Sequence, residues 1–362
     1  TRLFSLNRSG FAGTQRYGII PWTGDVSRSW AGLQAQLPIL LGMSMSGVPF
    51  IHSDAGGFAG GNGDKELYIR WLQLAAYTPI FRPHGTALFE KDPNAFSYPS
   101  EPHLIGEPYT AIAKNIVLNR YRMLPYNYTL GYLQTTQGEP LMSPLYHHHF
   151  FDRQAAQVQD AYLWGKDILV APVTTANTYQ RSVYLPQGKW YTSQGKMLVG
   201  GRTYTEDVPL DQTAIFYRAG AIIPMIPAER SIKTTQDCHY ATLEVHVYID
   251  EKNTHAFQLY NDDGVQKNSL TSKQYNLLEL KVAPKQGNLV FTAQPIHKGL
   301  PENVEKITWH IHGVSLDRPL VAKQQQASLK VNHTFKNTIV VETNLKNNVV
   351  QWQLVDYLRN LR

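Results

Sequence analysis

The sequence has a single cysteine, no long hydrophobic run and no block of charge of one sign. Because Cys238 stands alone among 362 residues, no disulfide forms within the chain, and the redox compartment stays open. The most apolar stretch, residues 35–51, is interrupted by Pro38, Gly42 and Pro49 and is shorter than the roughly 20 residues that a membrane helix needs. The sequence therefore predicts neither a disulfide scaffold nor a membrane span.

The excess of positive charge is small and spread along the chain. The 34 Lys and Arg residues stand against 28 Asp and Glu, for a formal net charge of +6. Nucleic-acid binding draws on clustered basic residues, and the sequence contains no basic run or stripe. We therefore expect no nucleic-acid partner.

Apolar residues make up 43% of the chain, enough for a folded core, and the length is that of two or three domains. Up to about residue 135, short apolar runs alternate with longer stretches of helical spacing, the pattern of about four β/α units around a parallel sheet. The expected strands are residues 3–6, 17–21, 48–52 and 79–81, and the expected helices are residues 29–43, 65–77 and 109–134.

From about residue 140 the apolar pattern changes to a period of two, with Gly, Pro and Asn at the turns, which is typical of a β-sandwich. The first such segment is expected to hold strands at residues 182–185, 189–192 and 214–218. After Pro227 a second all-β segment begins, with strands expected at residues 243–249, 254–260, 277–282 and 338–342. A boundary is therefore expected near residue 226.

Polar side chains that could take part in catalysis gather where the early strands are expected to end. These are Arg16 and Asp25 around the second strand, Asp54 after the third, and Arg82 and His84 after the fourth. In a β/α barrel the loops that follow the strands converge at one face and build the active site there. The sequence therefore predicts a site at this face.

The same region carries a series of ordered motifs. They are residues 5–13 (SLNRSGFAG), 15–18 (QRYG), 22–25 (WTGD), 53–58 (SDAGGF), 70–73 (RWLQ) and 81–84 (FRPH), followed by residues 165–173 (GKDILVAPV), 184–191 (YLPQGKWY), 218–224 (RAGAIIP) and 260–264 (YNDDG). This series resembles glycoside hydrolase family 31, whose members are retaining α-glucosidases, α-xylosidases and α-transglucosylases. The resemblance implies an α/β plus all-β fold: the second half of a (β/α)8 TIM barrel at residues 1–138, a proximal β-sandwich at 139–226 and a distal β-sandwich at 227–362.

By the same resemblance, Asp25 is the general acid/base. An α-glycosidic oxygen leaves poorly as an alkoxide, so a carboxylic acid must protonate it and then, as a carboxylate, deprotonate the incoming water or sugar hydroxyl. The resemblance also implies five substrate-binding residues: the hydrogen-bonding Arg16 and His84, the pocket-lining Asp54, and the apolar walls Trp22 and Phe58. It implies no metal and no cofactor.

Retaining chemistry needs a second carboxylate about 5 Å from the first, and Asp54 is the obvious partner for Asp25. The resemblance argues against this pairing, because the family nucleophile is an aspartate in a Trp-x-Asp-Met-Asn-Glu stretch on an earlier strand, which this sequence does not contain. Barrel closure also takes eight strands. We therefore expect an N-terminal remainder of the same enzyme, bound to this chain, to carry the nucleophile.

Other patterns favour structural interpretations. The run His147-His148-His149 is expected to be structural, because neighbouring strand residues point to opposite faces and no carboxylate stands at ligand spacing. Asp262-Asp263-Gly264 is expected to form a turn rather than a calcium loop. Four strand aromatics are expected in cores rather than as sugar platforms: Trp190, Tyr191, Trp309 and Trp352.

The main hypothesis is thus a retaining α-glycoside hydrolase or 4-α-glucosyltransferase acting on terminal α-glucosyl residues of α-linked oligosaccharides. An α-xylosidase and a noncatalytic carbohydrate-binding protein are the alternatives. The chain begins with Thr1 and no leader is visible, so we expect the natural N-terminus elsewhere. The proposed oligosaccharide substrate, and no residue of the sequence, favours a bacterial periplasmic or secreted protein.

Overall fold

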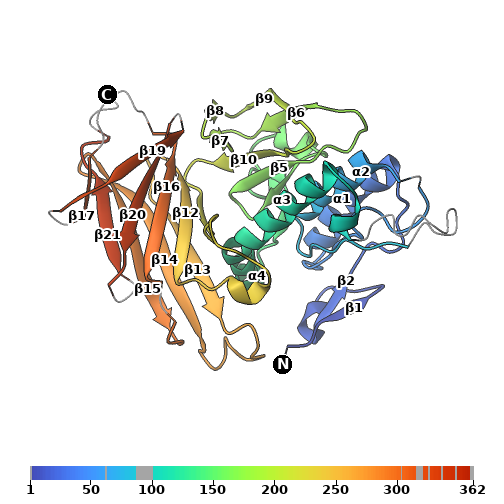
Figure 1. Ribbon diagram of the computed structural model, residues 1–362, viewed down its shortest axis with the longest axis horizontal. Coiled ribbons are helices and arrows are strands. Elements are labelled where there is room, and N and C mark those ends of the chain that lie inside the picture. The colour runs from blue at the N-terminus through green and yellow to red at the C-terminus, as the bar shows by residue number, and fades with distance from the viewer. Residues whose placement is uncertain are drawn as a thin grey trace.

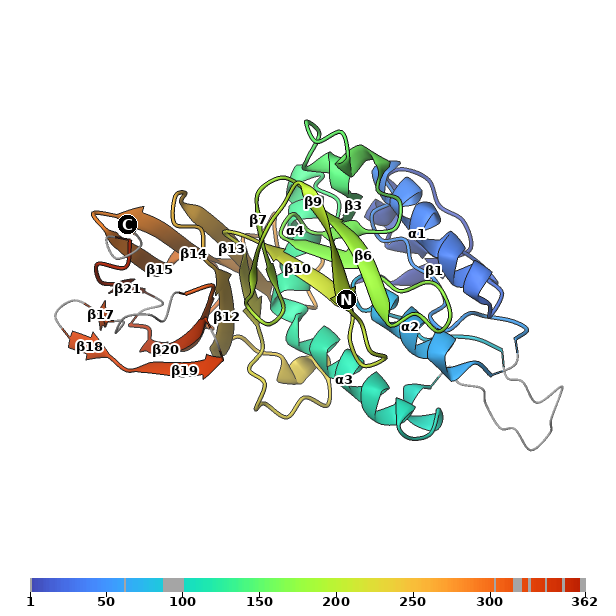
Figure 2. The ribbon, with the colours of Figure 1, turned by 90° about the horizontal axis from the view of Figure 1, so that it is seen from above.

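The computed structural model describes residues 2–61, 63–86, 101–302, 304–314, 321–324, 327–335, 337–346 and 349–358. Its helices gather at one end, around the first 140 residues, and two large sheets form the other end (Figure 1). A smaller sheet, formed by residues 142–218, lies between them (Figure 2). No helix among the residues described is long and apolar enough to cross a membrane.

Parallel pairing links four successive segments of the N-terminal region. Strands β1 (Ser5–Asn7) and β2 (Ile19–Pro21) pair in parallel. Two further segments join these strands through single parallel bridges: Trp22 pairs with His52, and Ala55 pairs with Pro83. The strands expected at 48–52 and 79–81 are therefore wrong as regular strands. Each segment contains one proline, Pro49 and Pro79, which removes a backbone N–H that a longer ladder requires.

Two capped helices follow the parallel segments. Helix α1 (Trp30–Met45) begins after Ser29, whose hydroxyl accepts a hydrogen bond from the Gly32 amide. Helix α2 (Lys65–Ala75) begins after Asp64, whose carboxylate accepts from the Leu67 amide at 3.0 Å. Such caps satisfy the free amides of the first turn, and both helices agree with the predicted ranges within two residues.

The helix expected at residues 109–134 is wrong as a single element. It is divided into α3 (Tyr109–Arg122) and α4 (Leu124–Gln137), with Met123 between them. Pro125 has no amide to donate to the preceding turn, and its ring disfavours a continuous helix at this point, so Pro125 lies instead in the first turn of the second helix.

The middle of the chain forms an antiparallel sheet in the order β3-β4-β5-β10-β7-β8 and a separate two-stranded sheet of β6 and β9. Their side chains share a core that includes Leu169, Trp190 and Phe216. Strands β7 and β10 have the predicted bounds. The bounds are β3 Met142–Pro144, β4 Tyr162–Trp164, β5 Ile168–Ala171, β6 Gln180–Leu185, β7 Lys189–Thr192, β8 Met197–Val199, β9 Arg202–Asp207 and β10 Ala214–Arg218.

The last part of the chain forms two sheets. The five-stranded sheet has the order β11-β12-β16-β20-β19 and the six-stranded sheet the order β13-β14-β15-β21-β17-β18. The bounds are β11 Ile222–Met225, β12 Thr242–Tyr248, β13 His255–Asp262, β14 Tyr275–Lys285, β15 Asn288–Lys298, β16 Lys306–His312, β17 Ala322–Gln324, β18 Ala327–Leu329, β19 Val331–Phe335, β20 Thr338–Asn344 and β21 Val350–Leu354.

Stacked aromatic rings join these two sheets. Phe291 and Trp352 of the six-stranded sheet stack at 4.2 Å, and Trp309 of the five-stranded sheet meets both rings edge-on. Trp190, Tyr191, Trp309 and Trp352 are all at most 1% exposed. The prediction that these four aromatics lie in cores is therefore confirmed.

A buried arginine fastens the helical region to the middle sheet. Arg70 of α2 has no exposed surface, and its guanidinium donates to the carbonyl oxygens of Val208, Gln212 and Thr178 at 2.7–3.1 Å. Each carbonyl belongs to a loop beside β6, β9 or β10. The planar donor fork thus satisfies several loop carbonyls at once and holds the two regions in a fixed relation.

Candidate active site

Five of the six predicted site residues lie on neighbouring segments of the parallel sheet, at or just beyond its paired positions. Trp22 and Asp25 follow β2, Asp54 follows the bridge at His52, and His84 follows the bridge at Pro83. Backbone bonds fix the order: the Thr23 amide donates to the His52 carbonyl and the Ala55 amide to the Arg82 carbonyl. The carboxyl ends of the three segments therefore meet at one face, as predicted.

At the centre of this face lies a buried ion pair. Asp54 has no exposed surface, and its carboxylate accepts a hydrogen bond from Arg82. Burial raises the pKa of Asp54, and the charge of Asp25 adds to this rise, whereas Arg82 and His84 oppose it. Arg82 thus opposes the effect of burial on Asp54, although burial remains the larger of the two.

His52 shares the same arginine. The Arg82 Nε donates to His52 Nε2 at 3.1 Å, and the imidazole has no exposed surface. Burial, and next the charge of Arg82, lower the pKa of His52 to about 4. His52 is therefore neutral at pH 7 and accepts the hydrogen bond, which fixes the orientation of the guanidinium.

Asp25 lies in a more open environment than Asp54. Its side chain is 45% exposed and its Oδ1 lies 3.2 Å from Nη1 of Arg8. The guanidinium groups of Arg8 and Arg82 lie 5.8 and 5.6 Å from the ring centre of Trp22. The indole of Trp22 therefore lies between the two ion pairs and contacts the arginine of each. Of the two carboxylates, only that of Asp25 is accessible to a ligand or to water.

Phe58 and His84 form one edge of the face. Their ring centres are 5.6 Å apart, at an angle of 38°. The turn that carries Phe58 requires glycine, because Gly57 has a φ of +83° and a Cβ there would lie 2.7 Å from the Cα of Arg28. This close packing positions an aromatic wall beside the polar groups.

Arg16 lies elsewhere. It belongs to the short helix η1 (Thr14–Tyr17), which precedes β2, and its exposed guanidinium lies over the ring of Tyr17 at 5.3 Å. Asp25 follows the other end of the same strand. The geometry thus brings five of the six predicted residues together, and Arg8 occupies the place expected of Arg16.

Arg8 and His52 had not been singled out from the sequence, and Arg82 had been given no role. Arg8 directly follows β1, so its place after a strand was a usable signal. His52 carried no comparable signal, because its role depends on burial and on the position of Arg82. A buried histidine next to an arginine cannot be recognised from spacing alone.

The histidine run differs from its prediction. His147 ends the short helix η3 (Leu145–His147) rather than lying on a strand, and Glu139 approaches both His147 and His148. The argument that no carboxylate stands near these histidines is therefore wrong. In contrast, Asp262 and Asp263 accept bonds from the amides that follow them, as expected of a turn.

Comparisons with known proteins match most of this chain. Residues 1–130 match the family model of the glycosyl hydrolases family 31 TIM-barrel domain, and residues 138–223 match that of the family 31 C-terminal domain. An α-xylosidase of Saccharolobus solfataricus is 31% identical over 355 residues, which cover 94% of this chain and 44% of that protein. The chain belongs to glycoside hydrolase family 31. In this family, neutral α-glucosidase C of Mus musculus is 37% identical over 267 residues, covering 73% of this chain and 28% of that protein.

The fold of this family 31 chain also matches solved structures. The dextranase of Flavobacterium johnsoniae, complexed with glucose, superposes with a TM-score of 0.83 at 22% identity. The match covers 98% of this chain and 46% of the dextranase. The chain thus spans less than half the length of the relatives that it matches.

Proposed function

We propose that this chain is the C-terminal part of a retaining α-glycoside hydrolase or transglycosylase that acts on terminal α-glucosyl residues of oligosaccharides. Asp25 is its general acid/base, and an aspartate on an N-terminal segment outside this chain is its nucleophile. The observation that carries the proposal is the contrast at one face between an open carboxylate, Asp25, and a buried one, Asp54.

Asp25 has the environment that this role requires. Its carboxyl must protonate the leaving oxygen and later take a proton from water or from a sugar hydroxyl. Such a group needs access to both partners, and the side chain is 45% exposed beside Arg8. Trp22 offers an apolar surface next to it for the C–H face of a sugar ring.

Asp54 is unsuited to act as the nucleophile. An attacking carboxylate must reach the anomeric carbon, but Asp54 has no exposed surface and is bonded to Arg82. Its place supports a binding role instead, in which it holds Arg82 against the pocket. This leaves the nucleophile to be supplied by another segment.

The architecture proposed with this function has three parts. The four parallel segments and α1 to α4 supply the second half of a (β/α)8 barrel at residues 1–138. The sheet of β3, β4, β5, β10, β7 and β8, with the β6–β9 pair, is the proximal β-sandwich predicted at 139–226, and the last two sheets are the distal β-sandwich predicted at 227–362. The predicted boundary is too late, because β11 (Ile222–Met225) pairs with β12 and belongs to the distal β-sandwich. Exposed apolar side chains near β1 support a missing half, since Leu3, Phe4 and Phe11 are 58–78% exposed.

The first test is native mass spectrometry of the purified protein. We expect a complex heavier than the 41.0 kDa of this chain, which releases a second polypeptide on denaturation. A folded, soluble monomer of 41.0 kDa would remove the basis for a barrel completed in trans and favour noncatalytic carbohydrate binding.

The acid/base is tested by Asp25→Asn in protein that includes the N-terminal segment. Turnover of natural α-glucosides should fall about 10²- to 10⁴-fold, with substrate binding retained, because only proton transfer is removed. An activated aryl glycoside should lose less. Asp160→Asn is the matched control, since Asp160 is also exposed and paired with an arginine, Arg181 at 2.8 Å. Equal activity of Asp25→Asn and wild type would refute the assignment.

An α-xylosidase is the second candidate, because the relative that covers 94% of this chain bears that name. The two activities differ in whether the pocket admits the 6-hydroxymethyl group of glucose. Comparing kcat/KM for aryl α-glucoside and α-xyloside decides between them. Measuring release of free sugar against transfer to an added acceptor separates hydrolysis from transglycosylation.

A further inference from the structure

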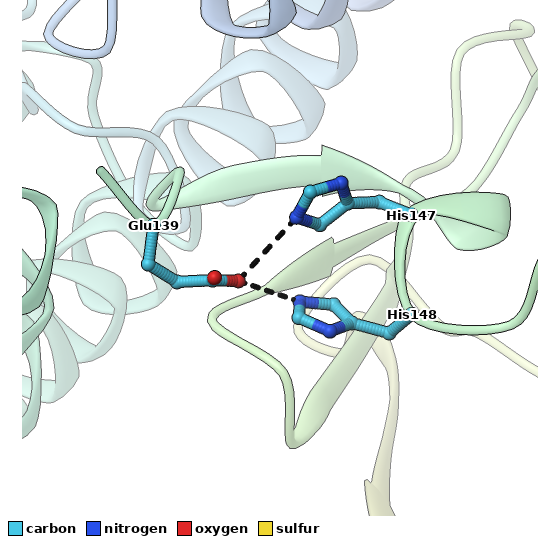
Figure 3. Close-up of side chains that lie close together, drawn as sticks. All are labelled: Glu139, His147 and His148. Atoms are coloured by element: carbon cyan, nitrogen blue, oxygen red, sulfur yellow. Dashed lines mark ion pairs between the residues drawn. The ribbon is translucent and has the colours of Figure 1, made fainter. Parts of the chain in front are cut away.

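Two histidines and a glutamate converge near the junction of α4 and β3, outside the candidate active site. The Nε2 atoms of His147 and His148 lie 3.5 and 2.9 Å from Oε1 of Glu139. Figure 3 shows the three side chains pointing toward one another, with the glutamate approaching from the end of α4. The three ligand atoms all lie within 4.8 Å of one another.

The local backbone explains this convergence. Gly138 ends α4 in the left-handed region, with a φ of +74°, and so turns the chain just before Glu139. His147 and His148 lie at the end of η3, where successive residues are about 120° apart around the axis instead of on opposite faces. Neighbouring histidines can therefore face the same carboxylate.

The contacts within this cluster do not satisfy its polar atoms. Oε1 of Glu139 and Nε2 of His148 are both enclosed by protein, yet neither makes a hydrogen bond. Two ligands about 2.0–2.2 Å from one Zn²⁺ ion lie roughly 3.3 Å apart at a tetrahedral angle and about 2.9 Å apart at a right angle. The two nitrogen-to-oxygen distances here lie close to these values.

We propose that Glu139, His147 and His148 bind a divalent transition-metal ion of the Zn²⁺, Co²⁺ and Ni²⁺ class. Two imidazoles with one carboxylate suit these ions, whereas Mg²⁺ and Ca²⁺ take oxygen ligands. Three protein ligands leave at least one position for water. The ion would tie the end of α4 to the turn after β3 and stabilise the junction between the helices and the middle sheet.

A second cluster of the same composition is less suited to a cation. In it Glu244 lies 3.5 Å from His246 and 4.0 Å from His310. Arg122 donates to the same oxygen of Glu244 at 2.6 Å, so a positive charge already occupies this carboxylate. At the first cluster the nearby charge of Arg218 is instead compensated by Asp167, at 2.6 Å.

The test is titration of the full chain, freed of metal with a chelator, by ZnCl₂ in a calorimeter and by CoCl₂ in a spectrophotometer. We expect Zn²⁺ to bind at this site with a ratio of one per chain, to raise the melting temperature, and Co²⁺ to give visible absorption typical of nitrogen and oxygen ligands. His148→Gln and Glu139→Gln should each weaken Zn²⁺ binding at least tenfold.

Two controls locate the ion. His149→Gln changes the neighbouring histidine, whose ring lies 5.8 Å from that of Trp190, and should leave Zn²⁺ affinity unchanged. His310→Gln removes a ligand of the second cluster and should also leave it unchanged. Circular dichroism without metal checks that each variant folds. If His148→Gln does not fold, the Zn²⁺ affinity of Glu139→Gln alone decides the test.

The proposal is overturned if the wild-type chain binds no Zn²⁺, or if Glu139→Gln binds as tightly as wild type. Loss of binding in His310→Gln but not in Glu139→Gln would assign the ion to the second cluster instead. None of these outcomes depends on glycosidase activity, so this proposal stands or fails separately from the proposed function.

Discussion

The two ends of the molecule differ in where they place large apolar side chains. In residues 2–86, His52, Asp54 and Arg70 have no exposed surface, whereas Phe4 and Phe11 are 58% and 78% exposed. Burying charge costs several kcal/mol unless it is well paired, and exposing large aromatic side chains forgoes the stabilisation of burial. The buried charges of this region are paired, Asp54 with Arg82 and Arg70 with loop carbonyls, so its exposed aromatic side chains are what it leaves unburied.

The described part of residues 242–358 also buries charge, at Glu244 and Asp262, but it encloses its large aromatic side chains in a core. Phe291, Trp309 and Trp352 form a stacked core at most 1% exposed, while Lys306 and Glu342 pair at the surface. The contrast supports our proposal that a further segment covers the N-terminal region, whereas the two C-terminal sheets bury their aromatic core within this chain. The following predictions test that division.

The largest effect is expected from the aromatic core. Trp352→Ala should lower the free energy of unfolding of the C-terminal sheets by about 3–5 kcal/mol, because it leaves a cavity beside Phe291 and Trp309. Phe11→Ala, at an exposed aromatic of the N-terminal region, should change stability by under about 0.5 kcal/mol. Hydrogen exchange measured by mass spectrometry separates the two regions. Equal losses for the two variants would break the comparison.

A pH effect is expected next, from the buried histidine. The pKa of His52 is about 4 in the folded chain, against 6.5 for an ordinary histidine. Between pH 6.5 and 4 the unfolded chain takes up a proton that the folded chain does not, so His52 lowers the free energy of unfolding by up to about 3 kcal/mol as the pH falls. Above pH 6.5 it has no such effect.

The measurement is the unfolding free energy of wild type and His52→Asn at pH 7 and at pH 4.5. The difference between the two proteins should shrink or reverse at the lower pH, because the variant has no proton to bind. His103→Asn, at an exposed position, is the control and should follow wild type. A His52→Asn curve parallel to that of wild type would show that His52 is protonated in the folded chain.

How far the sequence predicts the structure differs between the two regions for a physical reason. Side chains of a half-buried strand alternate strictly, so β7 and β10 were located to the residue and β12 and β13 within two. In the N-terminal region the parallel segments are short, three of the four contain a proline, and two of the four reduce to single bridges. A short apolar run in this region predicts where a parallel segment lies, but not whether it forms a regular hydrogen-bonded strand.

The sequence predicts where the site lies better than it predicts which side chains contact one another there. Motif and spacing place Asp25 and Asp54 just after the ends of strands. In a parallel sheet, the order of the strands in the chain then indicates that these carboxyl ends lie side by side. Motif and spacing do not distinguish Arg8 from Arg16, since both flank a strand and only three-dimensional placement shows which one reaches Asp25. The meeting of Glu139 with His147 likewise depends on a turn that has no periodic signal.

The two arginines give a direct test of this point. In protein that includes the N-terminal segment, Arg8→Ala should lower kcat/KM for an α-glucoside by about a hundredfold, or about 2.7 kcal/mol, because Arg8 contacts Asp25 and lies over Trp22. Arg16→Ala removes an equal charge outside the cluster and should change kcat/KM less than twofold. The reverse order would restore Arg16 as the substrate-binding residue and place Arg8 in a structural role.

The smallest effect is expected from the surface ion pair of the C-terminal sheets. Lys306 and Glu342 lie 2.8 Å apart, with side chains 39% and 57% exposed, and solvent screens such pairs so that each contributes about 0–1 kcal/mol. Glu342→Gln should therefore leave the unfolding midpoint in urea almost unchanged, at low and at high salt. A larger loss that disappears in salt would mean that charge also stabilises these sheets.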